Sequence, residues 1–205
     1  MEALPWIFSS GWASGINGYA VVVILGLMGR FGGAEDVPDV LTRTDVLVAA
    51  AVMFALDLIA DKIPYLDSTW DAVHTAVRPT IGAVLGALLA GDAGTLGEAV
   101  GATVGGTTAL VSHLVKAGLR AAVNTSPEPA SNIAVSATED VTVASVVALS
   151  VLHPWLAATV AAVLLCLGTV VVVLVLRRIR RFRRERRERR ARRAAGRPPG
   201  SRATG

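Results

Sequence analysis

Residues 56–71, LDLIADKIPYLDSTWD, place four aspartates and one lysine between two apolar segments, and the polar stretch continues through His74 to Arg78 and Pro79. An ionisable side chain at bilayer depth is costly unless another charge or water compensates it. Charges in such a place either fix the order of the helices or line a path for a polar solute. The rest of the sequence shows whether the setting is a membrane.

The composition is that of a membrane protein with a basic tail. The 205 residues are 53% hydrophobic and 18% charged, whereas soluble domains carry about 25% charged residues. Residues 177–205 contain fourteen arginines and two glutamates, which leaves six basic and fourteen acidic residues in residues 1–176. Because the net positive charge lies in the tail, we expect Arg177 to Arg193 to bind anionic lipid headgroups. We expect no nucleic acid as a partner.

The residue types that carry out chemistry do not form a recognisable active site. Cys166 is the only cysteine, which excludes a disulfide within the chain. His74, His113 and His153 are too scattered for a metal-binding spacing, and the sequence contains neither a phosphate-binding glycine loop nor a serine nucleophile elbow. We therefore expect no enzymatic activity, no metal and no cofactor.

The fold expected from these segments is an all-α integral membrane protein with about six transmembrane helices, since a spanning helix needs roughly 20 apolar residues. The predicted helices cover residues 3–29, 46–63, 71–90, 96–123, 131–153 and 155–176, within a transmembrane domain over residues 1–176. Asp45 is the expected N-cap of the second helix. The cytoplasmic tail, residues 177–205, is expected to extend the last helix and then to become disordered.

Glycine and small polar residues interrupt two of these helices. Residues 9–19 of the first helix are rich in Ser and Gly and include Asn17, so this half is expected to be broken or re-entrant, and the fourth helix also opens with several glycines. Six spans with basic residues on the cytoplasmic face place both termini in the cytoplasm. The two groups of three helices can be superposed as an inverted repeat with broken first and fourth helices, an arrangement of many secondary transporters. The matching stretches are short, so a chain without a repeat is an equal alternative.

Two interpretations of the charged residues stay open. In one, Lys116 and Arg120 face Asp57 and Asp61 as a two-rung ladder that fixes helix order. In the other, the charges line a path for a proton, an ion or a small anion. The candidate ion-pathway or ligand-binding residues are Asn17, Asp57, Asp61, Lys62, Asp67, Asp71, Arg78, Lys116, Arg120, Glu139 and Asp140.

Three smaller features accompany these charges. Trp70 suits a headgroup boundary. Asp67 and Asp71 lie four residues apart and could hold a cation, although an exposed loop pair is the expected arrangement. Gly82 and Gly86 belong to a small-residue stripe that lets two helices approach closely.

Several separated motifs also carry a resemblance to a known family. The motifs are SGINGY at 14–19, DKIPYLD at 61–67 with Trp70-Asp71, Arg78-Pro79, NTSPEP at 124–129, Ser131-Asn132 and Glu139-Asp140. Together they resemble the bacterial membrane family labelled domain of unknown function 4126 over roughly residues 9–176. The resemblance implies a multi-pass protein of the bacterial cytoplasmic membrane, assigns no reaction and leaves the arginine tail outside it.

The leading functional hypothesis is a small secondary transporter or permease-like protein for an ion or small polar solute. Asp57 and Asp61 would accept the proton or cation, and Lys116 and Arg120 would pair with them or contact an anion. The alternative is a non-transporting scaffold that binds lipid and forms a homo-oligomer through small-residue helix faces such as Gly82 and Gly86. The depth and openness of the aspartate cluster discriminate between the two.

Overall fold

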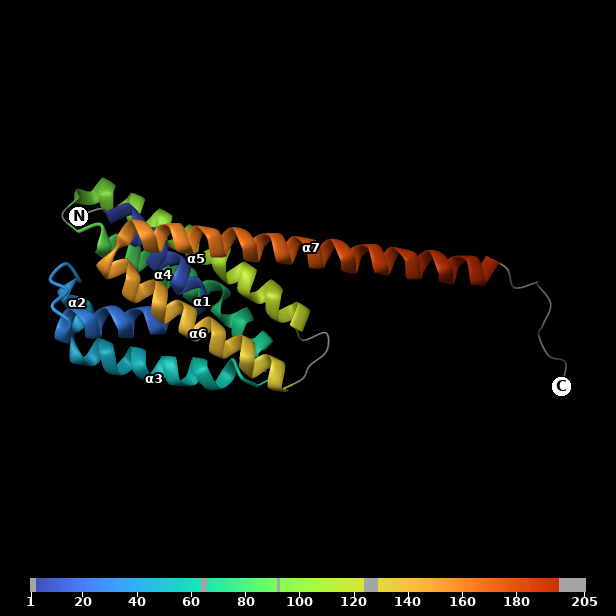
Figure 1. The fold of residues 1–205 in the computed structure, drawn as a ribbon, viewed down its shortest axis with the longest axis horizontal. Coiled ribbons are helices and arrows are strands. Elements are labelled where there is room, and N and C mark those ends of the chain that lie inside the picture. The colour runs from blue at the N-terminus through green and yellow to red at the C-terminus, as the bar shows by residue number, and fades with distance from the viewer. Residues whose placement is uncertain (1–2, 64–65, 92, 124–128, 196–205) are drawn as a thin grey trace.

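The computed structural model describes residues 3–63, 66–91, 93–123 and 129–195, and these residues form helices joined by short connections, with no strand among them. The helices are α1 (Ala3–Phe31), α2 (Asp39–Thr42), α3 (Thr44–Ala60), α4 (Leu66–Leu89), α5 (Gly94–Val123), α6 (Pro129–Leu152) and α7 (Pro154–Ala195) (Figure 1). The predicted all-helical class is confirmed.

Helix α1 is a bent-back pair of short helices. Asn17 has non-helical torsion angles, with φ −151° and ψ 90°. Trp6 and Met28 line one common cavity, although 22 residues of straight helix would separate them by about 33 Å. The two legs therefore run in opposite directions, with Asn17 at the tip of a hairpin inside the bundle (Figure 1). The expected re-entrant break in the first helix is confirmed.

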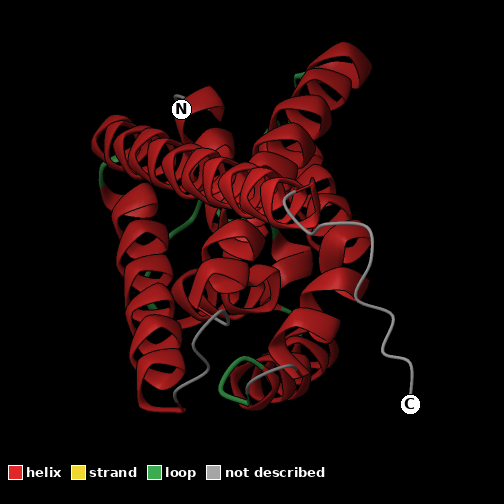
Figure 2. Ribbon diagram, turned by 90° about the vertical axis from the view of Figure 1, so that its right-hand side faces the viewer, coloured by secondary structure: helices red, strands yellow, loops and turns green. Residues whose placement is uncertain are grey.

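The remaining helices run back and forth along the bundle. Helix α3 runs away from the end at which α1 starts and finishes, and α4, α5, α6 and α7 then alternate in direction (Figure 1). Helix α1 packs against α3, α4, α5, α6 and α7, and Figure 2 shows the bundle of helices turned by 90° from the view of Figure 1. The buried apolar core joins both legs of α1 to α4, α6 and α7, through side chains such as Ile7, Leu25, Leu85, Val147 and Ala161.

Helices α4 and α5 form the most extensive pair, and their backbones touch along one half of it. A Cβ atom added to Gly86 would collide with the carbonyl oxygen of Gly101, and one added to Gly105 would collide with the carbonyl oxygen of Gly82. Gly11 of α1 meets Gly105 as well, where an added Cβ would lie 2.7 Å from the carbonyl oxygen. The predicted small-residue stripe is therefore confirmed as a helix-packing surface. Since α5 fills it within the same chain, it is not a free face for self-association.

Four described helical segments are long and apolar enough to cross a bilayer: Ala3–Phe31, Thr69–Leu89, Ile133–Leu152 and Pro154–Phe182. The first of these is the α1 hairpin, whose legs of 14 residues are each about 21 Å long. Helix α3 has 17 residues, slightly fewer than a spanning helix usually needs. Six spans are thus not confirmed, and no inverted repeat follows from this arrangement.

Several predicted helix ends need correction. The N-cap of α3 is Arg43, and Asp45 lies inside the first turn without capping it. Helix α4 starts at Leu66, so the predicted interfacial segment before Asp71 is the first turn of a helix. Helix α5 is continuous from Gly94 to Val123, so the predicted break in the fourth helix is wrong. Its glycines Gly101 and Gly105 lie against Gly86 and Gly82 of α4, where they allow close packing.

Helix α7 continues well past the bundle (Figure 1). Its 42 residues correspond to a length of about 63 Å. The apolar part carries exposed side chains such as Val170 (55%) and Leu174 (58%), which is typical of a lipid-facing helix. The helical extension through the arginines is observed up to Ala195, and residues 196–205, expected to be disordered, lie outside the described part.

Candidate charged site

A network of buried ion pairs lies at the end of the bundle where α3 and α5 finish and α4 and α6 begin. Three aspartates and three basic side chains form its centre, and every one of these residues is at most 3% exposed: Asp57, Asp61, Asp71, Arg78, Lys116 and Arg120. Four helices contribute to it, because α3 supplies the first aspartate, α4 and α5 supply the bases, and α6 supplies Glu139. Two nodes organise the contacts.

The first node is Asp61, directly after α3. Its Oδ2 accepts hydrogen bonds from Lys116 Nζ at 2.6 Å and from Arg120 Nη2 at 3.0 Å. Arg120 Nη1 also donates to the backbone carbonyl of Asp61 at 2.9 Å. The four-residue spacing of Lys116 and Arg120 puts both on one face of α5, so together they hold the end of α3 at a fixed position.

The second node is Arg78 of α4. Its Nη2 donates to Asp57 Oδ1 and its Nη1 donates to Asp71 Oδ1, both at 3.0 Å. Trp70 Nε1 donates to the same Asp57 oxygen at 2.6 Å. The guanidinium therefore bridges α3 and α4, and the indole of Trp70 takes part in the same network. Asp71, predicted in an exposed loop pair, is instead a buried helical residue.

The two nodes are joined, and a less buried layer covers them. Arg120 Nε lies 3.9 Å from Asp71 Oδ2, and Arg120 Nη2 lies 2.8 Å from Glu139 Oε2. Further out, Lys62 Nζ lies 3.5 Å from Asp140 Oδ2, where the two side chains are 34% and 19% exposed. The charges thus become more hydrated from the centre of the network toward α6.

The tip of the α1 hairpin reaches this network. In a regular helix the carbonyl of Ile16 would accept the N–H of Ala20, but that N–H donates to Asn17 Oδ1 at 3.0 Å. The released carbonyl of Ile16 accepts a hydrogen bond from Lys116 Nζ at 3.0 Å. The break therefore caps one short helix with a side chain and offers a backbone oxygen of the other to a buried ammonium group.

Two buried histidines lie beside the network, although their sequence positions did not suggest a common site. Arg78 Nη1 is 3.3 Å from His113 Nδ1 and Thr75 Oγ1 is 3.1 Å from His113 Nε2. Because guanidinium only donates, His113 accepts at Nδ1 and is neutral, and its Nε2–H donates to Thr75. His74 donates from Nδ1 to the carbonyl of Trp70 at 2.9 Å, which leaves Nε2 to accept from the Tyr19 hydroxyl at 3.1 Å.

The network does not balance in formal charge. Among the described side chains, the carboxylates of Asp57, Asp61, Asp71 and Glu139 face three cationic groups, and the Lys62–Asp140 pair adds equal charges of both signs. Asp57 Oδ2 and Asn17 Nδ2 are buried without a hydrogen-bond partner in the described part of the chain. One added proton or a monovalent cation would neutralise the cluster.

A small cavity leads to one side of the network. It has a volume of about 170 Å³ and lies between α1, α5, α6 and α7, with apolar walls from residues such as Trp12 and Leu164. Lys116 and Glu139 line it, whereas Asp57 and Arg78 do not. A solute in this cavity would meet the Lys116–Glu139 pair before any other part of the network.

Ten of the eleven predicted site residues can be placed. Nine belong to the charged network or its outer layer, and Asn17 forms the adjacent hairpin tip. The predicted two-rung ladder needs correction, because the base that pairs with Asp57 is Arg78. Asp67 lies in the first turn of α4 and its side chain is outside the described residues. Among the residues that are described, no group of three His, Cys, Asp or Glu side chains is arranged to hold a metal ion.

Comparison with known proteins gives the class of the chain and no activity. The family described as domain of unknown function (DUF4126) matches residues 4–174, so the chain belongs to that family. The matched range contains the hairpin, the charged network and the apolar part of α7, and it excludes the arginine-rich end. No curated protein and no solved structure matches the chain.

Proposed function

We propose that this protein is a small membrane transporter in which the charged network carries a proton or monovalent cation. The supporting observation is the surplus carboxylate in a cluster whose central side chains are at most 3% exposed. An excess of negative charge in a buried cluster is unfavourable even when each carboxylate has a basic partner, so the surplus favours uptake of one proton or cation. Binding and release of that ion would change the pairing among helices α3, α4, α5 and α6.

The hairpin tip supports the same proposal. Discontinuous membrane helices present carbonyl oxygens and helix ends to ions and substrates in many secondary transporters. Here the tip places Asn17 next to the carbonyl of Ile16 that binds Lys116, and its amide Nδ2 has no partner among the residues that the structure describes. In this function Lys116 releases its contact with Asp61 or Glu139 and contacts a solute, which reaches it through the cavity between α5, α6 and α7. Asp61 is then the proposed ion acceptor, and Lys116 is its partner.

The topology that we propose places the two ends of the helical bundle on opposite faces of the membrane, whereas the sequence predicted that both termini lie in the cytoplasm. Helix α1 begins at one end of the bundle, and the arginines of α7 leave the opposite end (Figure 1). If α3 to α7 each cross the bilayer once, five crossings place these two ends on opposite faces. Because Arg177 and the basic residues after it favour the cytoplasm, we place Ala3 on the outer face and the charged network toward the inner face.

Transport is tested by reconstitution of the full chain in liposomes with an imposed pH gradient and a panel of ions and small metabolites. We expect gradient-dependent uptake by the wild type and a loss of at least tenfold in Asp61→Asn, which removes the proposed acceptor. Asp45→Asn, a change at an exposed carboxylate of α3, is the matched control. Equal uptake by both variants would remove Asp61 from the mechanism, and absence of any proton or solute flux would reject transport.

A scaffold is the second candidate, favoured by the tight closure of the network. Every central charge has a partner within 3.0 Å, and the cavity reaches only its Glu139 side. In this function the pairs fix helix order, and the lipid-facing surface of α7 with its arginines holds headgroups or a second copy. The scaffold function would be supported if chemical crosslinking between copies and lipid binding both require α7, and if liposomes that contain the protein show no transport.

A further inference from the structure

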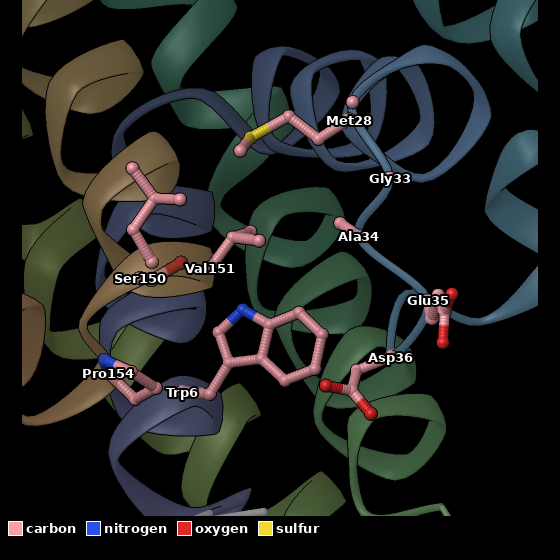
Figure 3. A pocket seen from close by; sticks show the side chains of 11 residues that line it. Trp6, Met28, Gly33, Ala34, Glu35, Asp36, Ser150, Val151 and Pro154 are labelled. Carbon is pink, nitrogen blue, oxygen red and sulfur yellow. The ribbon is translucent and has the colours of Figure 1, made fainter.

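A second cavity lies at the end of the bundle opposite the charged network. It has a volume of about 350 Å³ and lies between the two legs of the α1 hairpin, the loop after α1 and the junction of α6 with α7 (Figure 3). Trp6 comes from the first leg, Met28 from the second, and Ser150 and Val151 from α6. Its lining shares no residue with the charged network, so it is a separate site.

The floor of this cavity presents an unused hydrogen-bond donor. Trp6 is 2% exposed, and its Nε1 has no hydrogen-bond partner among the described residues. Buried indole N–H groups usually find an acceptor. Figure 3 shows the nitrogen on the ring edge turned toward Ser150 and Val151, away from Asp36. An oxygen atom of a bound molecule would complete the hydrogen bonding of Trp6.

Three other groups of the cavity wall are acceptors or carry negative charge. Pro154 has no N–H, so the carbonyl of Ser150, four residues earlier, lacks its usual helical donor. Helix α6 ends at Leu152, which brings the partial negative charge of a helix C-terminus to the cavity wall. The exposed carboxylates of Glu35 and Asp36 lie at the mouth (Figure 3). This wall favours a cation and repels an anion that carries no positive group.

We propose that this cavity binds an ethanolamine-phosphate group. The ammonium lies toward Glu35 and Asp36, and a phosphate oxygen accepts the hydrogen bond of Trp6. The two methylene groups between them pack on Met28 and on the small exposed part of Trp6. Both ends of such a zwitterion meet a complementary group, and the volume is within the range of small-molecule sites.

The surroundings favour a membrane lipid as the source of this group. A shallow apolar hollow formed by Leu152, Trp155 and Leu156 adjoins the cavity, and the two share Leu152 and Pro154. The three large side chains are 66%, 62% and 53% exposed. Acyl chains can cover these side chains while the headgroup enters the cavity, and Trp155 is suited to the interface.

The experiment uses the full chain in detergent with short-chain phosphatidylethanolamine, short-chain phosphatidylglycerol or free phosphoethanolamine. Binding is measured by native mass spectrometry and by the shift in the thermal unfolding midpoint. The variants are Trp6→Phe, which keeps the ring and removes the donor, and the double change Glu35→Gln with Asp36→Asn. Glu98→Gln, at an exposed carboxylate near the start of α5, is the matched control.

We expect phosphatidylethanolamine to bind and stabilise the wild type and Glu98→Gln equally, and to bind each of the other variants about fivefold more weakly, as for one lost hydrogen bond. Equal binding of free phosphoethanolamine would support the site and assign a soluble source. Equal binding of phosphatidylglycerol, no binding of either ethanolamine ligand, or binding unchanged in both cavity variants would overturn the proposal. The surface-exposed double variant decides the result if Trp6→Phe fails to fold.

Discussion

The two halves of the α4–α5 pair are held together by different kinds of contact. From Gly82 onward α4 meets the first half of α5 through glycine backbone, with no side chain between the helices at Gly86 and Gly101. Before Pro79, the same two helices are joined by polar side chains: Arg120 Nε of α5 lies 3.9 Å from Asp71 Oδ2 of α4, and Arg78 Nη1 of α4 lies 3.3 Å from His113 Nδ1 of α5. One half is held by close packing and the other by charge.

The difference indicates that the two halves of this helix pair have different structural roles. Glycine contacts allow a small separation that tolerates little variation, so the first half fixes the relative position of the helices. Charged side chains carry large rotamer entropy and interact favourably only in a suitable geometry. The rigid half supplies that geometry, since α4 and α5 carry Arg78, Lys116 and Arg120 from a frame that is already fixed. Four substitutions test this division, from the largest expected effect to the smallest.

The largest effect is expected for Arg78→Met. It leaves Asp57 and Asp71 buried without their base, and breaking a buried pair typically costs about 3–5 kcal/mol. The measurement is unfolding of the purified protein by denaturing detergent. The double change Arg78→Met with Asp57→Asn should recover part of this loss, because one uncompensated charge is removed. No recovery would indicate that packing of the guanidinium, rather than its charge, stabilises the pair.

A smaller decrease in the free energy of unfolding, of about 1–3 kcal/mol, is expected for Gly86→Leu. The added side chain collides with the backbone of Gly101, which cannot rotate away. Val84→Leu, at a 54% exposed position of the same helix, is the control and should unfold like the wild type. If both leucine variants behave alike in the same unfolding assay, the glycine half does not fix the helix separation.

The hairpin tip is expected to contribute about 1 kcal/mol through Asn17, the usual value of a side-chain helix cap. Asn17→Ala removes the acceptor of the Ala20 N–H and allows that N–H to return to Ile16. Lys116 then loses a backbone partner. Asn17→Ser keeps a capping oxygen without adding a buried charge and should retain more of the stability, whereas an equal loss in both variants would argue against capping.

No measurable decrease in the free energy of unfolding is expected for Arg43→Ala. Arg43 and Asp45 form hydrogen bonds at 3.0 and 2.7 Å, but their side chains are 63% and 66% exposed. Hydrogen bonding to Asp45 raises the pKa of Arg43 above its ordinary value, so this pair stays ionised near neutral pH. A loss comparable to that of Arg78→Met would contradict the view that burial makes the network important.

The sequence predicted the helical class, the charged cluster and the break in α1 because each has a local cause. Continuous apolar stretches predict helices, and the polar run around Asn17 predicts an interruption. Asp57 and Asp61 were recognised as unusual because charge is rare in such segments. These signals depend on neighbouring residues, so they can be read without the fold.

The partners within the site could not be predicted in this way. The assignment of Arg78 to Asp57, and the approach of His74 to Tyr19, depend on how helices cross, which sequence spacing does not specify. Trp70 was interpreted by its usual place in membranes, but Asp57 provides a stronger acceptor nearby. The glycines of α5 predicted a break, although glycine also serves close packing, and only the position of α4 distinguishes the two.

The bent form of α1 has a consequence for biogenesis. Each leg is about 21 Å long, shorter than the roughly 30 Å hydrocarbon layer, and its buried Ser9, Ser14 and Asn17 are surrounded by parts of the chain that the ribosome makes later. The hairpin is translated before α4 and α5, which supply much of its packing surface. We therefore expect it to reach its final place only when α4 and α5 are present, which runs against the order of translation.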